Sequence, residues 1–348
     1  MLLVPFPDHL LITYILSSTL LGMLSGIRLV TFDALHTIIK PRLPIYVQYS
    51  QAFEPYLGVL SPDAIRASFK SALRDVQKEH PSYRQGVETW WRDVIRRTAL
   101  GAGGNKKALD ANLAPIVDSL MKRFSSGEGY RAFHDAIPTI KQLSTMGIRT
   151  AVVSNGDSRL RSVLQDLDFP HIQDSILLSA EEGVEKPSQA IFMQALDLVN
   201  SNRNELQPIR PKECLHVGDE LECDYHGATA AGFNALLIRR PGPLGEGEQK
   251  EANEDLRDVQ CIGSLDEIPR RLLREAENEC KLQAGEFVRR TLPKGRHRSG
   301  VRANFRPASK FPPAKVLIGL PHLPVLHHIV RQPTNLEYRR IDITNMPF

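Results

Sequence analysis

The chain has 348 residues, of which 42% are hydrophobic and 24% are charged. These values are typical of a globular protein, and they exclude a wholly disordered, a collagen-like or a multi-span membrane protein. The four cysteines form no Cys-x-x-Cys pair, so we expect neither a disulfide framework nor a cysteine zinc site, and we expect a reducing compartment. Residues 281–348 hold 13 Lys and Arg against 3 Asp and Glu, whereas the rest of the chain has an acidic excess.

The first 26 residues contain no Lys or Arg and include an apolar stretch at 10–24. This stretch is shorter than the roughly 20 apolar residues that cross a bilayer comfortably. It also lacks the basic region that precedes the apolar part of a signal peptide. We therefore expect residues 1–26 to be an extension outside the main fold. A membrane anchor and an extra helix packed on the body are the alternatives.

From residue 27 onward, short runs rich in Leu and β-branched residues alternate with helical stretches. This alternation is typical of βαβ units and of a largely parallel sheet covered on both faces. The predicted fold is a three-layer, Rossmann-like α/β core. Strands are predicted at residues 27–32, 148–153, 174–178, 213–217 and 234–238, and helices at 136–146, 191–200 and 265–274.

Between residues 41 and 130 no strand is expected. Ser61 and Pro62 have the residue types of a helix N-cap and of the first helical position, so they predict a helix start. An insert of about 90 residues is far longer than an ordinary loop, so we expect a helical domain of its own. Helices are predicted in it at residues 62–79, 87–100 and 108–124.

Beyond residue 275 the helical pattern fades, and residues 281–348 contain eight prolines. A basic, proline-rich segment without a hydrophobic period predicts a disordered tail. Such a tail could contact acidic partners or the import machinery, so we expect a cytoplasmic or nuclear location, and nucleic acid is not expected as a substrate. The predicted domains are the extension (1–26), the core (27–40 and 131–275), the insert (41–130) and the tail (276–348).

Polar residues follow the predicted strands, where the carboxyl ends of a parallel sheet form its active-site edge. A carboxylate there can attack phosphorus and form an aspartyl-phosphate, and a second carboxylate can hold Mg²⁺. A serine hydroxyl and a lysine ammonium can neutralise the transferring group. The residues in question are Asp33, Ser154, Asn155, Lys186, Asp219 and Asp224.

These residues, in this order, resemble the four motifs of the haloacid dehalogenase (HAD)-like hydrolase superfamily. Asp33 matches motif one, Ser154 motif two and Lys186 motif three, and residues 218–224 have the GDxxxxD form of motif four. The helical insert is similar to the type C1 cap of that superfamily. Residues 162–187 and 190–232, together with Trp90 and Trp91, also resemble one subfamily, haloacid dehalogenase-like hydrolase domain-containing protein 3.

The resemblance implies roles for these residues. Asp33 would be the nucleophile, and Ser154, Asn155 and Lys186 would bind the phosphoryl group. Mg²⁺ would be the cofactor. Its ligands would come from Asp33, Leu35 (through its backbone carbonyl), Asp219 and Asp224.

One position departs from the phosphatases of the superfamily. They carry an aspartate two residues after the nucleophile as general acid and base, and Leu35 stands there in this chain. Losing such a group typically costs about 10²–10⁴-fold in rate. His36 replaces the usual glycine; with an unperturbed pKa of about 6.5 it could act as a substitute acid and base, or it could simply pack under the cap. His216 is expected to face a helix rather than the site.

The sequence thus predicts a Mg²⁺-dependent phosphatase of small phosphate esters whose acid–base catalysis is weakened at Leu35. A catalytically inactive protein that binds phosphate or a partner is the alternative. A 2-haloacid dehalogenase is a lesser alternative, because residues 33–37 and 154–156 resemble the first two motifs of those enzymes. Those enzymes lack the GDxxxxD arrangement, which would leave Asp219 and Asp224 unexplained.

Overall fold

The structure is a computed structural model that describes residues 26–80, 83, 85–170, 175–201, 207–245, 250 and 254–291. The predicted extension up to residue 25 and the predicted tail from residue 292 onward lie outside the described residues. Within the described ranges, none of the helices has both the length and the apolar composition that crossing a membrane requires.

The core is built on a parallel sheet with the strand order β5-β4-β1-β6-β7-β8. After β5 the chain crosses to the other side of β1, so a topological switch point lies beside this central strand. Phe32 at the end of β1 pairs with Val152 and Val217, which brings the carboxyl ends of three strands to one edge. The strands are β1 (Leu29–Phe32), β4 (Arg149–Ser154), β5 (Ile176–Leu178), β6 (Cys214–Gly218), β7 (Asn234–Ile238) and β8 (Cys261–Ile262).

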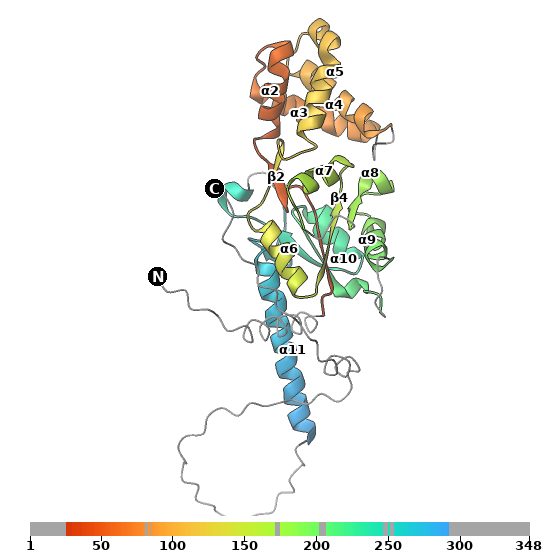
Figure 1. The fold of residues 1–348 in the computed structure, drawn as a ribbon, viewed down its shortest axis with the longest axis vertical. Helices are drawn as coiled ribbons and strands as arrows, with labels where there is room; N and C mark the ends of the chain where they lie inside the picture. Colours follow the sequence, from red (N-terminus) through yellow and green to blue (C-terminus); the bar gives the residue numbers. More distant parts are fainter. Residues whose placement is uncertain are drawn as a thin grey trace, which may run out of the picture. The chain divides into compact units, whose positions relative to one another are not determined.

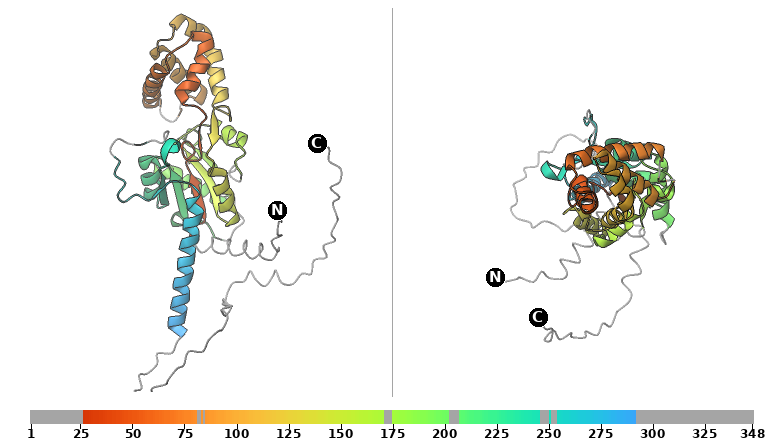
Figure 2. Two further views of the ribbon diagram at one scale, coloured as in Figure 1. Left: turned by 90° about the vertical axis from the view of Figure 1, so that its left-hand side faces the viewer. Right: turned by 90° about the horizontal axis from the view of Figure 1, so that it is seen from above.

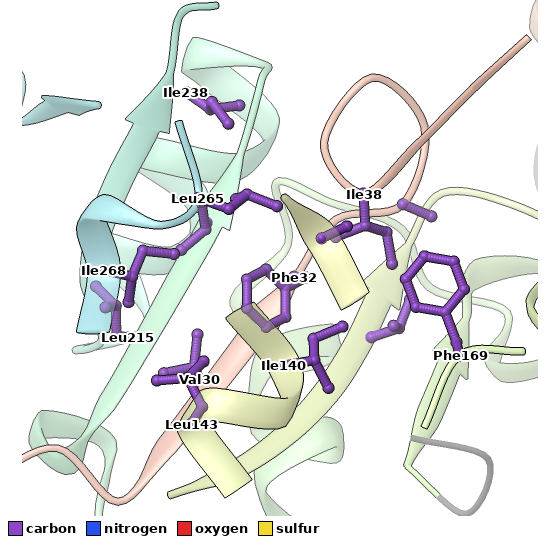
Figure 3. Packing of buried hydrophobic residues seen from close by; sticks show 14 of the residues in the cluster. Val30, Phe32, Ile38, Ile140, Leu143, Phe169, Leu215, Ile238, Leu265 and Ile268 are labelled. Atoms are coloured by element: carbon purple, nitrogen blue, oxygen red, sulfur yellow. The ribbon is translucent and has the colours of Figure 1, made fainter. Parts of the chain in front are cut away.

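Both faces of this sheet are covered, because alternate residues of each strand point to opposite sides. Val30 and Phe32 belong to a core formed with α6, α7 and α11 (Figure 3). Leu29 belongs to a second core, formed with α9 and α10. The predicted three-layer α/β fold is therefore confirmed. The helices are α6 (Ala136–Thr145), α7 (Arg159–Asp166), α9 (Gln189–Ser201), α10 (Gly227–Ala230) and α11 (Glu267–Thr291), with α8 (Ser179–Glu182) and the single turns η2 (Pro211–Glu213), η3 (Leu221–His226) and η4 (Gly242–Gly245).

The segment inserted after β1 forms the cap, a group of helices with its own apolar clusters (Figures 1 and 2). Helix α3 begins at Pro62, as predicted, and the Asn105 side chain caps α5 by accepting the Ala108 N–H at 3.0 Å. A short antiparallel ribbon of β2 and β3 joins the cap to the core. The elements are β2 (Ile39–Pro41), α2 (Ile45–Leu57), α3 (Pro62–Glu79), α4 (Val87–Gly101), α5 (Lys106–Arg123) and β3 (Tyr130–Ala132).

Several elements of the described part of the chain were not predicted, among them α2, β2, β3 and β8. Helix α2 buries the polar Gln48 beside Tyr49 and Phe53 and contains Pro55, so its apolar period is hard to recognise. Strands β2, β3 and β8 have only two or three residues each, and such short segments carry no readable alternation.

The last helix is longer than expected. It was predicted at 265–274, with a disordered tail from 276, but α11 continues to Thr291 and extends beyond the sheet (Figures 1 and 2). The prediction of disorder is therefore wrong for residues 276–291. Helix-favouring Glu, Leu, Lys, Arg and Ala residues are common in this stretch, so it continues a helix whose first turns pack on the core through Ile268 and Leu272.

Candidate active site

The polar residues predicted from the motifs converge at the carboxyl edge of the sheet. Asp33 directly follows β1, Ser154 ends β4 and Asp219 follows β6. Lys186 comes from the loop before α9, and its Nζ lies 2.6 Å from Asp33 Oδ1. All four residues are more than nine-tenths buried, and all four line one cavity.

Lys186 joins two carboxylates. Its Nζ donates to Asp224 Oδ1 as well as to Asp33 Oδ1, both at 2.6 Å. Burial alone would lower the pKa of Lys186, but the carboxylates of Asp224 and Asp33 outweigh burial and raise it above its ordinary value. Lys186 is therefore a permanent ammonium beside the proposed nucleophile.

The two carboxylates that Lys186 joins differ in their proton affinity. Burial raises the pKa of Asp33 from 3.8 to about 6, against the opposing effect of Lys186. Burial also disfavours the charged form of Asp224, yet Lys186 and the hydrogen bond from His216 hold the pKa of Asp224 below its usual range. Near pH 7 both side chains are thus ionised, and Asp33 retains the higher basicity of the two.

Three carboxylates in this cluster are placed to share a cation. Asp33, Asp219 and Asp224 each offer a ligand oxygen, and these atoms lie within 4.8 Å of one another. Oxygen ligands suit Mg²⁺, and the negative charge of these three buried side chains exceeds the single positive charge of Lys186. The donor set therefore fits a divalent cation. Leu35 lies in the lining of the same cavity, in the turn that bridges to Ile39.

His216 has a contact that the sequence did not predict. Its ring packs edge-on against Phe192 of α9, as expected for a residue facing a helix, with 5.0 Å between ring centroids. Its Nε2 also lies 3.2 Å from Asp224 Oδ1, and its Nδ1 lies 2.8 Å from Thr31 Oγ1. Because Asp224 is ionised, Nε2 donates to it. His216 therefore helps to hold Asp224 in place, together with Lys186.

Asn155 lines the cavity, but both polar atoms of its side chain bind the backbone of Lys186. Its Oδ1 accepts the Lys186 backbone N–H at 2.7 Å, and its Nδ2 donates to the Lys186 carbonyl at 3.0 Å. The predicted role in binding phosphate would thus fall to the backbone of Asn155. In this structure, the side chain positions Lys186.

His36 follows Leu35 in the cavity lining and has a φ of 65°, in the left-handed region that glycine adopts most easily. This conformation explains why a glycine is common at this motif position. Burial lowers the pKa of His36 from 6.5 to about 4, and Lys40 adds to the shift. At neutral pH the imidazole is therefore uncharged and can accept a proton but not supply one.

The cavity has a volume of about 640 Å³ and lies between the core and the cap. At its rim, Trp91 of α4 donates from Nε1 to Asp157 Oδ2 at 2.9 Å. Arg159 forms two hydrogen bonds to the same carboxylate, at 2.8 and 2.7 Å, and its guanidinium lies 4.5 Å from the Trp91 ring centre. This contact joins residues 66 positions apart, so no local pattern in the sequence predicts it.

Known proteins that resemble this chain belong to the superfamily whose motifs the site residues match. A family profile described as haloacid dehalogenase-like hydrolase matches residues 27–232. "Haloacid dehalogenase-like hydrolase domain-containing protein 3" of Bos taurus is 31% identical over 223 residues, which are 63% of this chain and 84% of that protein. The Homo sapiens protein of the same name is 32% identical over 223 residues, which are again 63% of this chain and 84% of that protein. The predicted resemblance to this subfamily is confirmed.

Solved structures show the same fold at low identity. A defluorinating L-2-haloacid dehalogenase has a TM-score of 0.53 at 14% identity, covering 71% of this chain and 95% of its own. A second L-2-haloacid dehalogenase has a TM-score of 0.51 at 22% identity, covering 71% and 99%. From the family match, the relatives and the order of the four motifs, the chain belongs to the haloacid dehalogenase-like hydrolases.

Proposed function

We propose that the protein is a Mg²⁺-dependent phosphatase of small phosphate monoesters, with Asp33 as its nucleophile. The observation that carries this proposal is the buried cluster in which Lys186 bridges Asp33 and Asp224, while Asp219 offers an oxygen within 4.8 Å of a carboxylate oxygen of each. An ammonium beside a nucleophilic carboxylate and a set of oxygen ligands together match the requirements of phosphoryl transfer to a carboxylate.

The reaction has two displacements. In the first, an Asp33 carboxylate oxygen attacks phosphorus and the bond from phosphorus to the ester oxygen breaks, so that the alcohol leaves with a proton from solvent. In the second, water attacks the aspartyl-phosphate, the bond from phosphorus to Asp33 breaks, and phosphate and a proton are released. Ser154 and Lys186 would bind the phosphoryl oxygens. Mg²⁺ held by Asp33, Asp219, Asp224 and the Leu35 carbonyl would offset the repulsion between carboxylate and phosphate.

Leu35 limits both displacements. It is half-buried in the cavity lining, at the position where an acid and base would act, and its side chain can neither give nor take a proton. Turnover is therefore expected to be slow relative to phosphatases with an aspartate at this position. His36 lines the cavity next to it and is the remaining candidate for proton transfer.

The same leucine favours a second function, that of a phosphate-binding or regulatory protein without turnover. The cluster around Lys186 could still bind a phosphate group in such a protein. A dehalogenase is less well supported, because a reaction without metal does not explain why Asp219 joins Asp33 and Asp224 in the buried cluster.

The test uses the full chain with a panel of phosphate monoesters, with Mg²⁺ and with EDTA. We expect phosphate release that needs Mg²⁺ and is abolished in Asp33→Asn. Mg²⁺-dependent binding of orthovanadate without release from any ester would favour the binding protein. Halide release from a 2-haloacid in the presence of EDTA would favour the dehalogenase.

A further inference from the structure

The wall that the cap contributes to the active-site cavity is mostly apolar. Helices α2 and α3 supply Ile45, Phe69 and Leu73, α4 supplies Trp91, and Tyr130 comes from β3. All five are half-buried rather than sealed inside the cap. Side chains of this kind, facing a cavity of about 640 Å³, are typical of pockets that hold the organic part of a small molecule, which span roughly 300–1,000 Å³.

The described residues of the cap wall also carry no charged side chain. Among the described residues that line the cavity, those from the cap include no Asp, Glu, Lys or Arg, and their amide and hydroxyl groups belong to Gln77, Tyr83 and Tyr130. The acidic and basic residues of the lining come from the core, where Glu185 and Glu220 add negative charge around the Lys186 cluster. A second acidic group on a substrate would thus face uncharged side chains on the cap side of the cavity and carboxylates on the core side.

Arg159 is the basic residue of the described lining outside the Lys186 cluster, and it is already engaged. Its Nε and Nη2 bind the two oxygens of Asp157, and its guanidinium stacks on Trp91. Recruiting it to a carboxylate or a second phosphate would break a bidentate pair that is largely buried. The pair therefore works as part of the wall and not as an anion receptor.

The wall is fixed before a ligand arrives. Trp91 is held by its hydrogen bond to Asp157, by Arg159 on its face and by Trp90, whose ring centroid is 4.9 Å away. A rigid apolar surface binds an apolar group with little loss of side-chain freedom. It offers few partners for the hydroxyl groups of a sugar or a polyol, whose desolvation would go uncompensated.

Resting on the phosphatase function proposed above, we propose that the substrates are phosphate monoesters of apolar or aromatic alcohols without a second acidic group. The phosphate would lie on the core side of the cavity, at Asp33 and Lys186, and the organic part would lie against the cap wall at Phe69, Leu73 and Trp91.

Binding is tested on the full chain with Mg²⁺ by calorimetry, using three phosphonates that cannot be hydrolysed. These are 2-phenylethylphosphonate, 3,4-dihydroxybutylphosphonate and 3-phosphonopropanoate, which mimic benzyl phosphate, glycerol phosphate and phosphoglycolate. We expect the phenyl compound to bind at least about 10-fold more tightly than either of the others, since one well-filled apolar contact is worth about that factor. Equal binding, or a preference for the carboxylate, would overturn the proposal.

A second test of the proposal places a positive charge in the cap wall. Leu73→Lys should shift the preference by about 10-fold towards 3-phosphonopropanoate, because it gives the cap wall a cation. Val59→Lys adds the same charge at an 82% exposed position of the cap outside the cavity, and it should leave the preference unchanged. A Leu73→Lys protein that folds and keeps the wild-type preference would place the organic group elsewhere and contradict the proposal.

Turnover separates this proposal from the function on which it rests. Benzyl phosphate and glycerol phosphate both release a primary alcohol, so their rates compare recognition at similar leaving-group chemistry. Equal hydrolysis rates for the two esters would support the phosphatase function and overturn the proposed preference for apolar groups. Selective binding of the phenyl phosphonate with no hydrolysis of any ester would uphold the apolar preference and overturn the phosphatase.

Discussion

The carboxyl group of Asp224 occupies the space beside Gly218 that a side chain would fill. A Cβ atom at position 218 would lie 2.1 Å from both Cγ and Oδ2 of Asp224. This close approach turns Asp224 back over the end of β6, where it receives hydrogen bonds from Lys186 Nζ at 2.6 Å and from the Glu220 backbone N–H at 2.9 Å. The glycine of the GDxxxxD motif therefore positions the residue that ends it.

Gly218→Ala is the direct test of this relationship. The added methyl group must displace Asp224 and with it the ammonium of Lys186, so we expect phosphatase activity to fall by at least about 10²-fold, as for a misplaced catalytic group. Overpacking should also lower the free energy of unfolding by about 1–3 kcal/mol, measured by denaturant titration. Gly263→Ala is the matched control, because its Cβ would meet nothing closer than 3.6 Å. Equal activity in the two variants would contradict this role of Gly218.

Asp219→Asn tests the metal site. If Asp219 is a ligand, saturating Mg²⁺ at about 100 times its dissociation constant should stabilise the wild type by about 2.7 kcal/mol, and the variant should lose most of this gain. Thermal unfolding with and without Mg²⁺ measures it. Asp118→Asn, at an exposed position of α5, should respond to Mg²⁺ like the wild type. An unchanged Mg²⁺ response in Asp219→Asn would remove this residue from the ligand set.

The fold was predictable because its strands are buried on both faces and follow one another at helix-length intervals. Runs such as Leu29–Phe32 are apolar enough to be recognised without any knowledge of their partners. The site residues were predictable for a related reason, because a residue that follows a buried parallel strand must lie at the active-site edge. Asp33 and Asp219 both follow this rule.

The contacts that support the site were not predictable. Strand alternation correctly directed His216 towards α9, but its contact with Asp224 depends on how the turn after β6 folds back. The contact of Trp91 with Asp157 depends on how the cap is seated on the core. Neither packing arrangement leaves a period or a spacing in the sequence, so both emerge only in three dimensions.

Asp135 should make stability depend on pH. It accepts hydrogen bonds from Arg240 Nη1 at 2.7 Å and Nη2 at 3.0 Å, and from Ser264 Oγ and the Leu265 N–H at 2.9 Å. Burial would raise the pKa of Asp135, but Arg240 and these other donors together hold it below its usual value of 3.8. The stabilisation is therefore fully present above about pH 4 and is lost as the pH falls through the lower folded-state value.

Asp135→Asn removes the carboxylate charge that the buried Arg240 guanidinium contacts through Nη1 and Nη2. We expect the free energy of unfolding at pH 7 to fall by roughly 3–5 kcal/mol, and the difference from the wild type to shrink below pH 4. Denaturant titrations between pH 7 and pH 3 measure both effects. Asp255→Asn, which breaks the exposed pair with Arg257, is the control and should change stability little at any pH. A difference that stays constant with pH would exclude the ion pair as its cause.

Leu35→Asp should increase phosphatase activity, because the nucleophile, the lysine and the carboxylate cluster are already assembled around the missing proton carrier. Acid–base catalysis typically contributes about 10²–10⁴-fold, which sets the upper limit of the gain. The new carboxylate would face the cavity from a half-buried position, so its desolvation should be tolerated. Initial rates on benzyl phosphate measure the effect, with Leu35→Asn as the control that adds polarity without a proton to transfer. A gain that persists in the double variant with Asp33→Asn would show that another group is the nucleophile. A fast wild type that His36→Ala silences would assign proton transfer to His36.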